Sequence, residues 1–89
     1  MKKIGAIGKR LPMTHEIKIL PQYFADVYKG IKRFELRKDD RDYQVGDLVT
    51  LQEWDGEAYT TNSISVVIKY VLRDCQHYGL MKGYCIFGW

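Results

Sequence analysis

An alternation of hydrophobic and polar positions begins at residue 14 and is the first sign of regular structure along the chain. Residues 15–20 (HEIKIL) place a histidine and two isoleucines on one face and two charged residues on the other. Successive side chains of a β-strand point to opposite faces, so this period of two predicts a strand.

A short helix is predicted directly after this strand. Pro21 suits the first turn of a helix, where a backbone N–H is not needed, and Gly30 suits the end of one. The apolar residues of this stretch recur at helical spacing: Tyr23, Phe24, Val27 and Ile31. The helix spans about ten residues, and Leu20 at its N-cap position lacks the side-chain oxygen that normally marks a helix start.

Four further strands are predicted in the rest of the chain, each bounded by turn residues. They span residues 33–37, 48–54, 63–73 and 83–89. The longest run is expected to follow a polar loop and to bury one apolar face: Ile64, Val66, Ile68, Tyr70 and Leu72. On the opposite face it carries Ser65, Lys69 and Arg73.

The order of the elements is strand, helix and then strands, without the βα repetition that builds a parallel doubly wound sheet. We therefore expect a mainly β (α+β) fold, a small barrel or half-barrel of about five to six strands with the helix covering one end. Residues 14–89 form this domain. Residues 1–13 precede the pattern and are expected to be a basic arm that packs weakly, or alternatively an arm that seeks phosphate.

Composition changes this picture little. The chain has 89 residues, one domain's worth, and 14 Lys+Arg against 11 Asp+Glu give a net charge of +3. This mild basic excess is compatible with an anionic partner such as RNA, DNA or a nucleotide. No apolar run reaches the ~18 residues of a membrane span, and no signal peptide is recognisable. We expect a cytoplasmic protein with no membrane partner.

The cysteines and histidines indicate neither a metal site nor a cofactor. Cys75 and Cys85 are not a CxxC pair, and His15 and His77 complete no zinc-binding spacing. We expect two free thiols in a reducing compartment, although a disulfide would need only the right geometry. Phosphate-loop, nucleophile-elbow and HExxH motifs are absent from the sequence.

The run from Gly30 to Arg37 (GIKRFELR) fits the pattern G-x-K-x-x-E-x-R, and a VGD turn and strand follow at residues 45–51 (VGDLVTL). Together with the order of elements, these motifs resemble the ASCH domain, a branch of the PUA-like superfamily. The run FELRKDDRDYQVGD is similar to an uncharacterised bacterial and phage-associated group of ASCH-like domains. The resemblance covers residues 14–89. It implies a β-barrel with a cleft beside the helix-to-strand junction, where ASCH domains are proposed to bind RNA or nucleotides.

One branch of that family is enzymatic, and the resemblance to it is incomplete. Acetylcytidine amidohydrolases use a lysine, a threonine and a glutamate. Lys32 matches the lysine, but Glu35 stands at the position of the threonine. If the chain were such an enzyme, Lys32 would act as base or nucleophile activator and Glu35 as acid/base. A lysine and a glutamate this close stabilise each other's charge, which works against that role. The sequence therefore favours binding over catalysis.

The candidate ligand-binding site begins with a charged strand face. Glu35 and Arg37 leave the same face of the strand, Arg33 is expected to join them, and Lys32 lies in the turn just before. Such a group can orient a guanidinium for bidentate contact with a phosphate or a base edge. The alternative is a solvated strand face with exposed ion pairs of little energetic value.

Three further residues have two interpretations each. Lys38 and Arg41 would extend a phosphate-binding rim, or belong to an ordinary polar loop that Asp40 braces through the backbone. His15 is either structural, on the isoleucine face, or a hydrogen-bonding group at the mouth of the cleft. The tyrosines and tryptophans after the motif either fill the core or stack on bases.

These features lead to one preferred function and two alternatives. The preferred function is a module that binds RNA or a nucleotide-like anionic ligand through Lys32, Glu35 and Arg37, with Lys38, Arg41 and His15 around them. The alternatives are a small amidohydrolase that acts on a modified nucleoside, and a protein-interaction module that pairs an exposed strand edge with a partner. No sequence feature indicates an oligomeric state.

Overall fold

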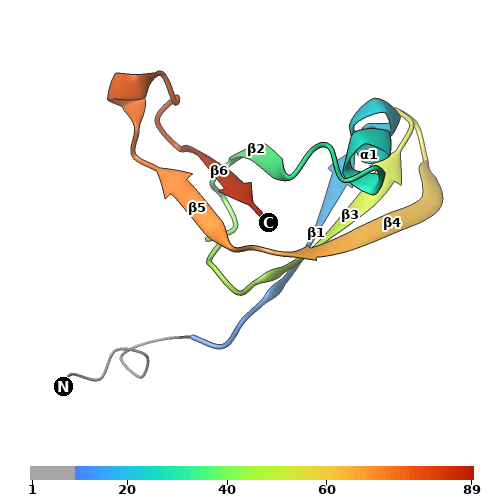
Figure 1. Cartoon of the computed structure of the whole chain (residues 1–89), viewed down its shortest axis with the longest axis horizontal. Coiled ribbons are helices and arrows are strands. Elements are labelled where there is room, and N and C mark those ends of the chain that lie inside the picture. Colours follow the sequence, from blue (N-terminus) through green and yellow to red (C-terminus); the bar gives the residue numbers. More distant parts are fainter. Residues whose placement is uncertain (1–9) are drawn as a thin grey trace.

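The computed structural model of the chain describes residues 10–89, which hold six strands, one α-helix and one 3-10 helix. The elements are β1 (Thr14–Ile19), α1 (Pro21–Tyr28), β2 (Phe34–Lys38), β3 (Leu48–Trp54), β4 (Tyr59–Val67), β5 (Tyr70–Arg73), η1 (Gln76–Tyr78) and β6 (Tyr84–Gly88). The strands form two three-stranded sheets, in the orders β1-β3-β4 and β2-β6-β5. In Figure 1, α1 lies over one end of the first sheet. The mainly β prediction is thus confirmed.

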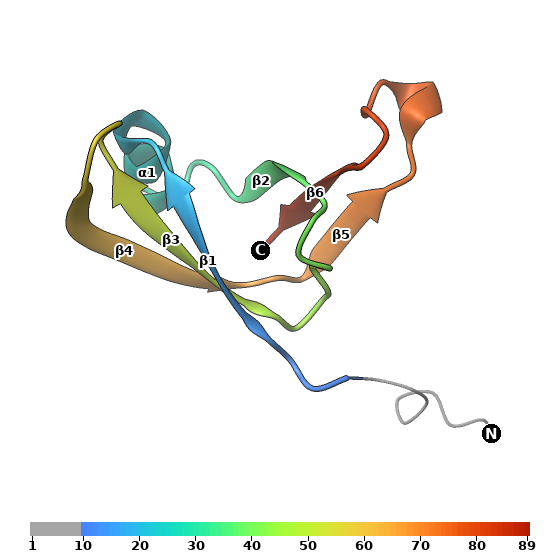
Figure 2. The ribbon, with the colours of Figure 1, turned by 180° about the vertical axis from the view of Figure 1, so that it is seen from behind.

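The chain crosses between the two sheets three times, before β2, before β3 and before β5. β1 runs parallel to β3, whereas the other three pairings are antiparallel. Figures 1 and 2 show the sheets diverging from the point where β4 leads into β5. Within residues 10–89 no backbone ladder joins β1 to β2, so the predicted barrel is not confirmed.

The core lies where the inner faces of the two sheets and α1 meet. Its buried members come from both sheets, from α1 and from the two connecting segments: Ile17, Ile19, Val27, Tyr43, Val49, Leu51, Ile68, Cys85 and Phe87. The alternation at the start of the chain is confirmed, because every second residue of β1 is buried. The helix begins at Pro21 as predicted, and Leu20 at its N-cap makes no side-chain capping bond.

Two arginine side chains bridge the gap between β1 and β2. Arg41 donates from Nη1 to the backbone carbonyl of Glu16 at 2.9 Å, and Arg37 donates from Nη2 to the carbonyl of Lys18. An unpaired strand edge leaves backbone groups without partners. Guanidinium groups therefore take the place of a strand ladder at this junction.

The longest alternating run, residues 63–73, does not form one strand. Its chain leaves the first sheet at Ile68, whose N–H bonds the carbonyl of Asp47, and enters the second sheet two residues later. Val71 then turns inward, whereas Tyr70 is 66% and Leu72 36% exposed, so the prediction that these two are buried is wrong. A shift of one residue at the crossing exchanges the two faces of a strand. The polar loop expected before this run is also shorter, because β4 starts at Tyr59.

The predicted basic arm falls mostly on residues 1–9, which lie outside the described residues. Residues 10–13 lead into β1 and contact the domain, as described below. No helix of residues 10–89 is both long enough and apolar enough to cross a membrane.

Candidate functional site

A cleft of about 580 Å³ opens between the two sheets beside α1. The first sheet contributes the ends of β1 and β3, and the second contributes β2. Its walls are made by Lys18, Ile19, Leu20, Tyr23, Lys32, Phe34, Glu35, Leu36, Arg37 and Trp54. The predicted motif therefore lines this cleft, at the helix-to-strand junction.

Glu35 is the buried anion of the cleft. Only 6% of it is exposed, and its two carboxylate oxygens accept from different cations. Oε1 accepts from Nζ of Lys32, and Oε2 accepts from Nε of Arg37 at 3.1 Å. The structure thus brings together the three residues that the motif singled out. The solvated strand face considered as an alternative is wrong for Glu35, because β2 turns this face toward β1 and α1.

Arg33 does not belong to this group, contrary to expectation. It precedes the first residue of β2, and its Nε donates to the carbonyl of Trp89 at 3.4 Å. The strand alternation that would align Arg33 with Glu35 begins only at Phe34. The charged group of the cleft is therefore Lys32, Glu35 and Arg37.

The cations of the cleft keep hydrogen-bond donors that no group within residues 10–89 uses. A lysine ammonium has three donors and a guanidinium has five. Lys32 directs two of its donors to Glu35 and to the carbonyl of Phe34. Arg37 directs one to Glu35 and one to the carbonyl of Lys18. The remaining donors can meet a ligand anion, while Glu35 holds both cations in place.

Aromatic rings stand next to these cations. Nζ of Lys32 lies 4.9 Å from the centroid of the Phe34 ring and 5.8 Å from that of Tyr23. Nζ of Lys18 lies 4.4 Å from the ring centroid of Trp54. At such distances a cation is attracted to the ring face, which favours this arrangement of charge and ring.

Sequence reasoning missed Lys18, Tyr23 and Trp54 as members of the site. Tyr23 was assigned to the apolar positions of the helix, and Trp54 was one of several aromatics. The sequence placed Lys18 on the face of β1 opposite the buried isoleucines, and this was the one sign that its side chain could contact another part of the fold. Nothing in the linear pattern indicated that this element would be the cleft.

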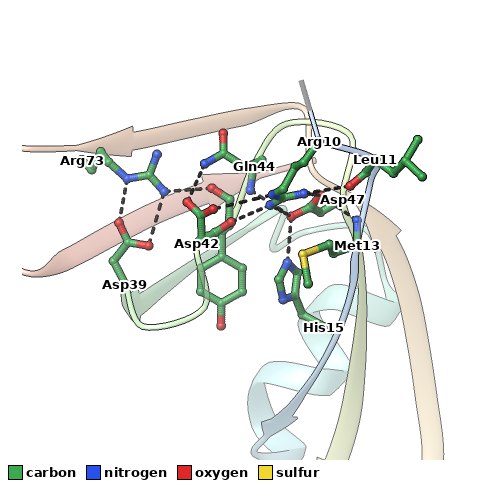
Figure 3. A network of polar contacts seen from close by, with 10 residues as sticks. Arg10, Leu11, Met13, His15, Asp39, Asp42, Gln44, Asp47 and Arg73 are labelled. Atoms are coloured by element: carbon green, nitrogen blue, oxygen red, sulfur yellow. Dashed lines mark hydrogen bonds and ion pairs between the residues drawn. The ribbon is translucent and has the colours of Figure 1, made fainter. Parts of the chain in front are cut away.

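Lys38 and Arg41 lie outside the walls of the cleft, in contrast to the rim predicted for them. Both are exposed, and Arg41 is engaged with the carbonyl of Glu16. The loop after β2 is braced by Asp39, whose carboxylate meets Nε of Arg73 at 2.6 Å (Figure 3). Hydrogen bonding to this carboxylate raises the pKa of the Arg73 guanidinium.

His15 is buried and does not line the cleft. Its Nε2 lies 2.8 Å from Oδ2 of Asp47, and its ring packs on Tyr43 with centroids 4.8 Å apart. Of its two interpretations, the structural one fits this position. Figure 3 shows His15 pointing toward the carboxylate from β1.

Asp47 is the centre of this second polar group, and the sequence had shown it only as a turn residue. It is fully buried and accepts from both terminal nitrogens of Arg10, at 3.0 and 2.9 Å. It also accepts from the backbone N–H groups of Met13 and Gln44, each at 3.0 Å. Burial acts to raise the pKa of Asp47, but the hydrogen bonds from Arg10 and His15 hold it well below its usual range.

The thiols and the acidic groups show no further chemistry within the described part of the chain. Cys75 and Cys85 are both free, as predicted. Burial raises the pKa of the Cys85 thiol to about 11, which leaves it protonated and unreactive near neutral pH. Nowhere in residues 10–89 do three or more His, Cys, Asp or Glu side chains gather closely enough to hold a metal ion.

Comparison with known proteins identifies a family but no activity. The sequence model of a family described as a domain of unknown function, DUF3850, matches residues 14–89. The "Uncharacterized 12.9 kDa protein in GpA 3'region" of Escherichia phage P2 is 41% identical over 54 residues, which cover 61% of this chain. The match spans 50% of the phage protein. Neither description names a ligand or a reaction, so the chemistry of the cleft is the guide to function.

Proposed function

The chain belongs to the DUF3850 family, and we propose that it binds RNA or a nucleotide-like anionic ligand in the cleft around Glu35. The observation that carries this proposal is the presence of three cations and three aromatic rings in one cleft. The cations are Lys18, Lys32 and Arg37, and the rings are those of Tyr23, Phe34 and Trp54. A nucleotide combines an anionic phosphate with a flat ring and matches both.

The cations would hold phosphate and the rings would hold a base. Charge-assisted hydrogen bonds of this kind contribute about 1.5–3 kcal/mol each. Stacking of a base on an aromatic side chain contributes about 1–3 kcal/mol and tolerates any base. Glu35 supports such a site because its ion pairs fix Lys32 and Arg37 before a ligand arrives.

The same contacts favour binding over an amidohydrolase reaction. Lys32 donates to a carboxylate and to a carbonyl, which suits a charged ammonium and not the neutral amine that a base must be. Each oxygen of Glu35 accepts a hydrogen bond from a cation, so this carboxylate already serves to position Lys32 and Arg37. The amidohydrolase alternative has no supporting observation in the cleft.

A relationship of this family to the ASCH branch of PUA-like domains is part of the proposal. It is supported by the G-x-K-x-x-E-x-R motif and by the cleft at the helix-to-strand junction. Between β1 and β2 a barrel of that kind would be held by arginine side chains. A cytoplasmic location is also proposed, and the free thiols of Cys75 and Cys85 support it, since disulfides are uncommon in reducing compartments.

The test is a binding titration with UMP and with a short fluorescein-labelled oligo(U). The clean variant is Lys18→Ala, because the ammonium of Lys18 lies near the rings of Trp54 and Tyr59 and forms no ion pair with residues 10–89. We expect Lys18→Ala and Lys32→Ala each to weaken binding about tenfold or more, since each removes one charged contact to phosphate. Lys82→Ala is the matched control, because Lys82 is exposed and lies outside the cleft.

Circular dichroism would verify that each variant is folded. If the wild-type protein binds neither probe, the proposed function is wrong. If it binds but both cleft variants retain full affinity, the ligand lies elsewhere on the molecule.

A further inference from the structure

The outer face of the second sheet is apolar and largely exposed. Side chains alternate along each strand, and Glu35, Val71 and Phe87 point inward, so their neighbours point outward. The register aligns two outward rows across β2, β6 and β5. One row is Phe34, Gly88 and Tyr70, and the other is Leu36, Ile86 and Leu72.

The first of these rows contains a slot between two aromatic side chains. Gly88 on the central strand separates Phe34 from Tyr70 and carries no side chain; a Cβ there would lie 3.2 Å from the backbone oxygen of Arg33, so this close approach of β2 also favours glycine. The outer strands of three lie about 10 Å apart, twice the spacing of paired strands. A flat ring between two others needs roughly 7 Å, two van der Waals separations of 3.5 Å. The slot is therefore wide enough for one base.

The two rings are free to make such a contact. Phe34 is 49% exposed and Tyr70 is 66% exposed. The ring–ring contacts of residues 10–89 do not pair them with each other or with any other aromatic. Large exposed apolar side chains gathered on one face of a sheet are a common mark of an interaction surface.

Three cationic residues lie at this end of the sheet, and one of them, Lys32, is paired with Glu35. Lys32 lies next to the Phe34 ring, and Lys69 directly precedes Tyr70. Arg33 lies at the same end of the sheet, bonded to the carbonyl of Trp89. Residues 68–71 and 86–89 contain no acidic residue. If two copies stacked through this face about an axis along β6, the cations beside β2 would meet Lys69 of the second copy and repel it, whereas an anionic polymer would neutralise both.

The slot is continuous with the cleft described above. Phe34 and Leu36 line the cleft and also belong to the outer rows. A strand whose phosphate lies near Lys32 can therefore pass over the edge of β2 onto the outer face. From this continuity and the charge we propose that the ligand is a single-stranded nucleic acid of several nucleotides, with one base held between Phe34 and Tyr70 over Gly88. This inference rests on the proposed function of the cleft.

The test compares Tyr70→Leu with the wild-type protein in titrations with UMP and with labelled oligo(U) and oligo(dT) of about eight nucleotides. Tyr70 does not line the cleft, and leucine keeps an apolar side chain while it removes the ring. We expect Tyr70→Leu to weaken oligonucleotide binding about tenfold and to leave UMP binding unchanged. Tyr70→Phe should bind like the wild type. Tyr78→Ala is the matched control, because Tyr78 is 84% exposed and lies in η1.

Each outcome separates this inference from the proposed function. If UMP binds but the oligonucleotides bind no more tightly, or if Tyr70→Leu binds them like the wild type, the slot is not used although the cleft is. If the wild-type protein binds no probe at all, both proposals are wrong. If the wild-type protein sediments as a dimer that Tyr70→Asp separates, the face binds a second copy and the inference is overturned. Preference for oligo(U) over oligo(dT) would identify RNA as the source of the strand.

Discussion

Replacement of Asp47 by asparagine tests the buried polar group that anchors residues 10–13 to the domain. The carboxylate accepts hydrogen bonds from Arg10, His15 and two backbone N–H groups, those of Met13 and Gln44 (Figure 3). Asparagine has nearly the same shape but carries no charge and offers a single acceptor oxygen. The nitrogen that replaces the other oxygen would point a donor at groups that are themselves donors.

The magnitude follows from the burial of Asp47. A hydrogen bond to a charged group contributes about 1.5–3 kcal/mol, and loss of one partner of a buried ion pair costs about 3–5 kcal/mol. Part of this is retained, because the amide oxygen keeps some of the contacts and Arg10 reaches solvent. We therefore expect Asp47→Asn to lower the free energy of unfolding by about 2–4 kcal/mol. That is a large fraction of the ~5–10 kcal/mol of a domain of this size.

The pH dependence of this loss gives a second check. The pKa of Asp47 is lower in the folded state than its ordinary value of 3.8, so its ionised form stabilises the folded state at pH values above that. This stabilisation disappears as the pH falls toward the folded pKa. The difference between the wild-type protein and Asp47→Asn should thus shrink as the pH falls below about 4.

The assay is urea unfolding followed by the fluorescence of Trp54 and Trp89, repeated over this pH range. Asp42→Asn is the control, because the Asp42 carboxylate is exposed and lies 3.6 Å from Nε of Arg10. We expect the control to change stability by less than about 0.5 kcal/mol. An Asp47→Asn variant as stable as the control, or a deficit that persists undiminished in acid, would refute the reasoning.

Two further predictions concern the junction of the sheets and the thiols. Arg37→Ala should lower the free energy of unfolding by about 2–4 kcal/mol, because Glu35 stays buried with one partner fewer. Arg41→Ala should lower it by less than about 1 kcal/mol. Urea unfolding of both variants would measure the difference. An equal loss in both would mean that the burial of Glu35 is not the cause. In the folded protein a thiol-specific disulfide reagent should label Cys75 readily and Cys85 only upon unfolding, because Cys85 is fully buried and its pKa is raised to about 11. Rapid labelling of both in the native state would contradict this.

The local alternation of apolar and polar residues was enough to predict the strands that stay within one sheet. β1 alternates from Thr14 to Ile19, and β3 occupies residues 48–54 as predicted. The first helical residue is Pro21, whose ring favours that position. In these segments the side-chain period and the turn residues agree with the tertiary environment, so the sequence determines the element directly.

Residues 63–73 show where the local pattern fails. Their alternation is nearly continuous, yet the chain passes from one sheet to the other at Ile68 and the inward face changes with it. A period of two carries no information on which sheet a residue belongs to. The exposure of Tyr70 could therefore be found only from the pairing of β5 with β6.

The site was predictable only as far as its residues are close in sequence. Lys32, Glu35 and Arg37 lie within six positions, and their spacing alone suggested that they would meet. Lys18 and Trp54 reach the cleft because β1 and β3 are paired in parallel, so that both strands end beside it. Such proximity depends on the whole topology, which no short motif encodes.

The open junction between β1 and β2 connects the fold to the proposed function. A continuous strand ladder there would pair the carbonyl of Lys18 with backbone N–H groups and close the space that the cleft occupies. Arg37 instead donates from Nη2 to this carbonyl and from Nε to Glu35. Its remaining N–H groups have no partner within residues 10–89. Side-chain bridges satisfy the edge of β1 without filling the gap. The open junction thus lets one set of residues stabilise the contact between the sheets and still present charge to the proposed ligand.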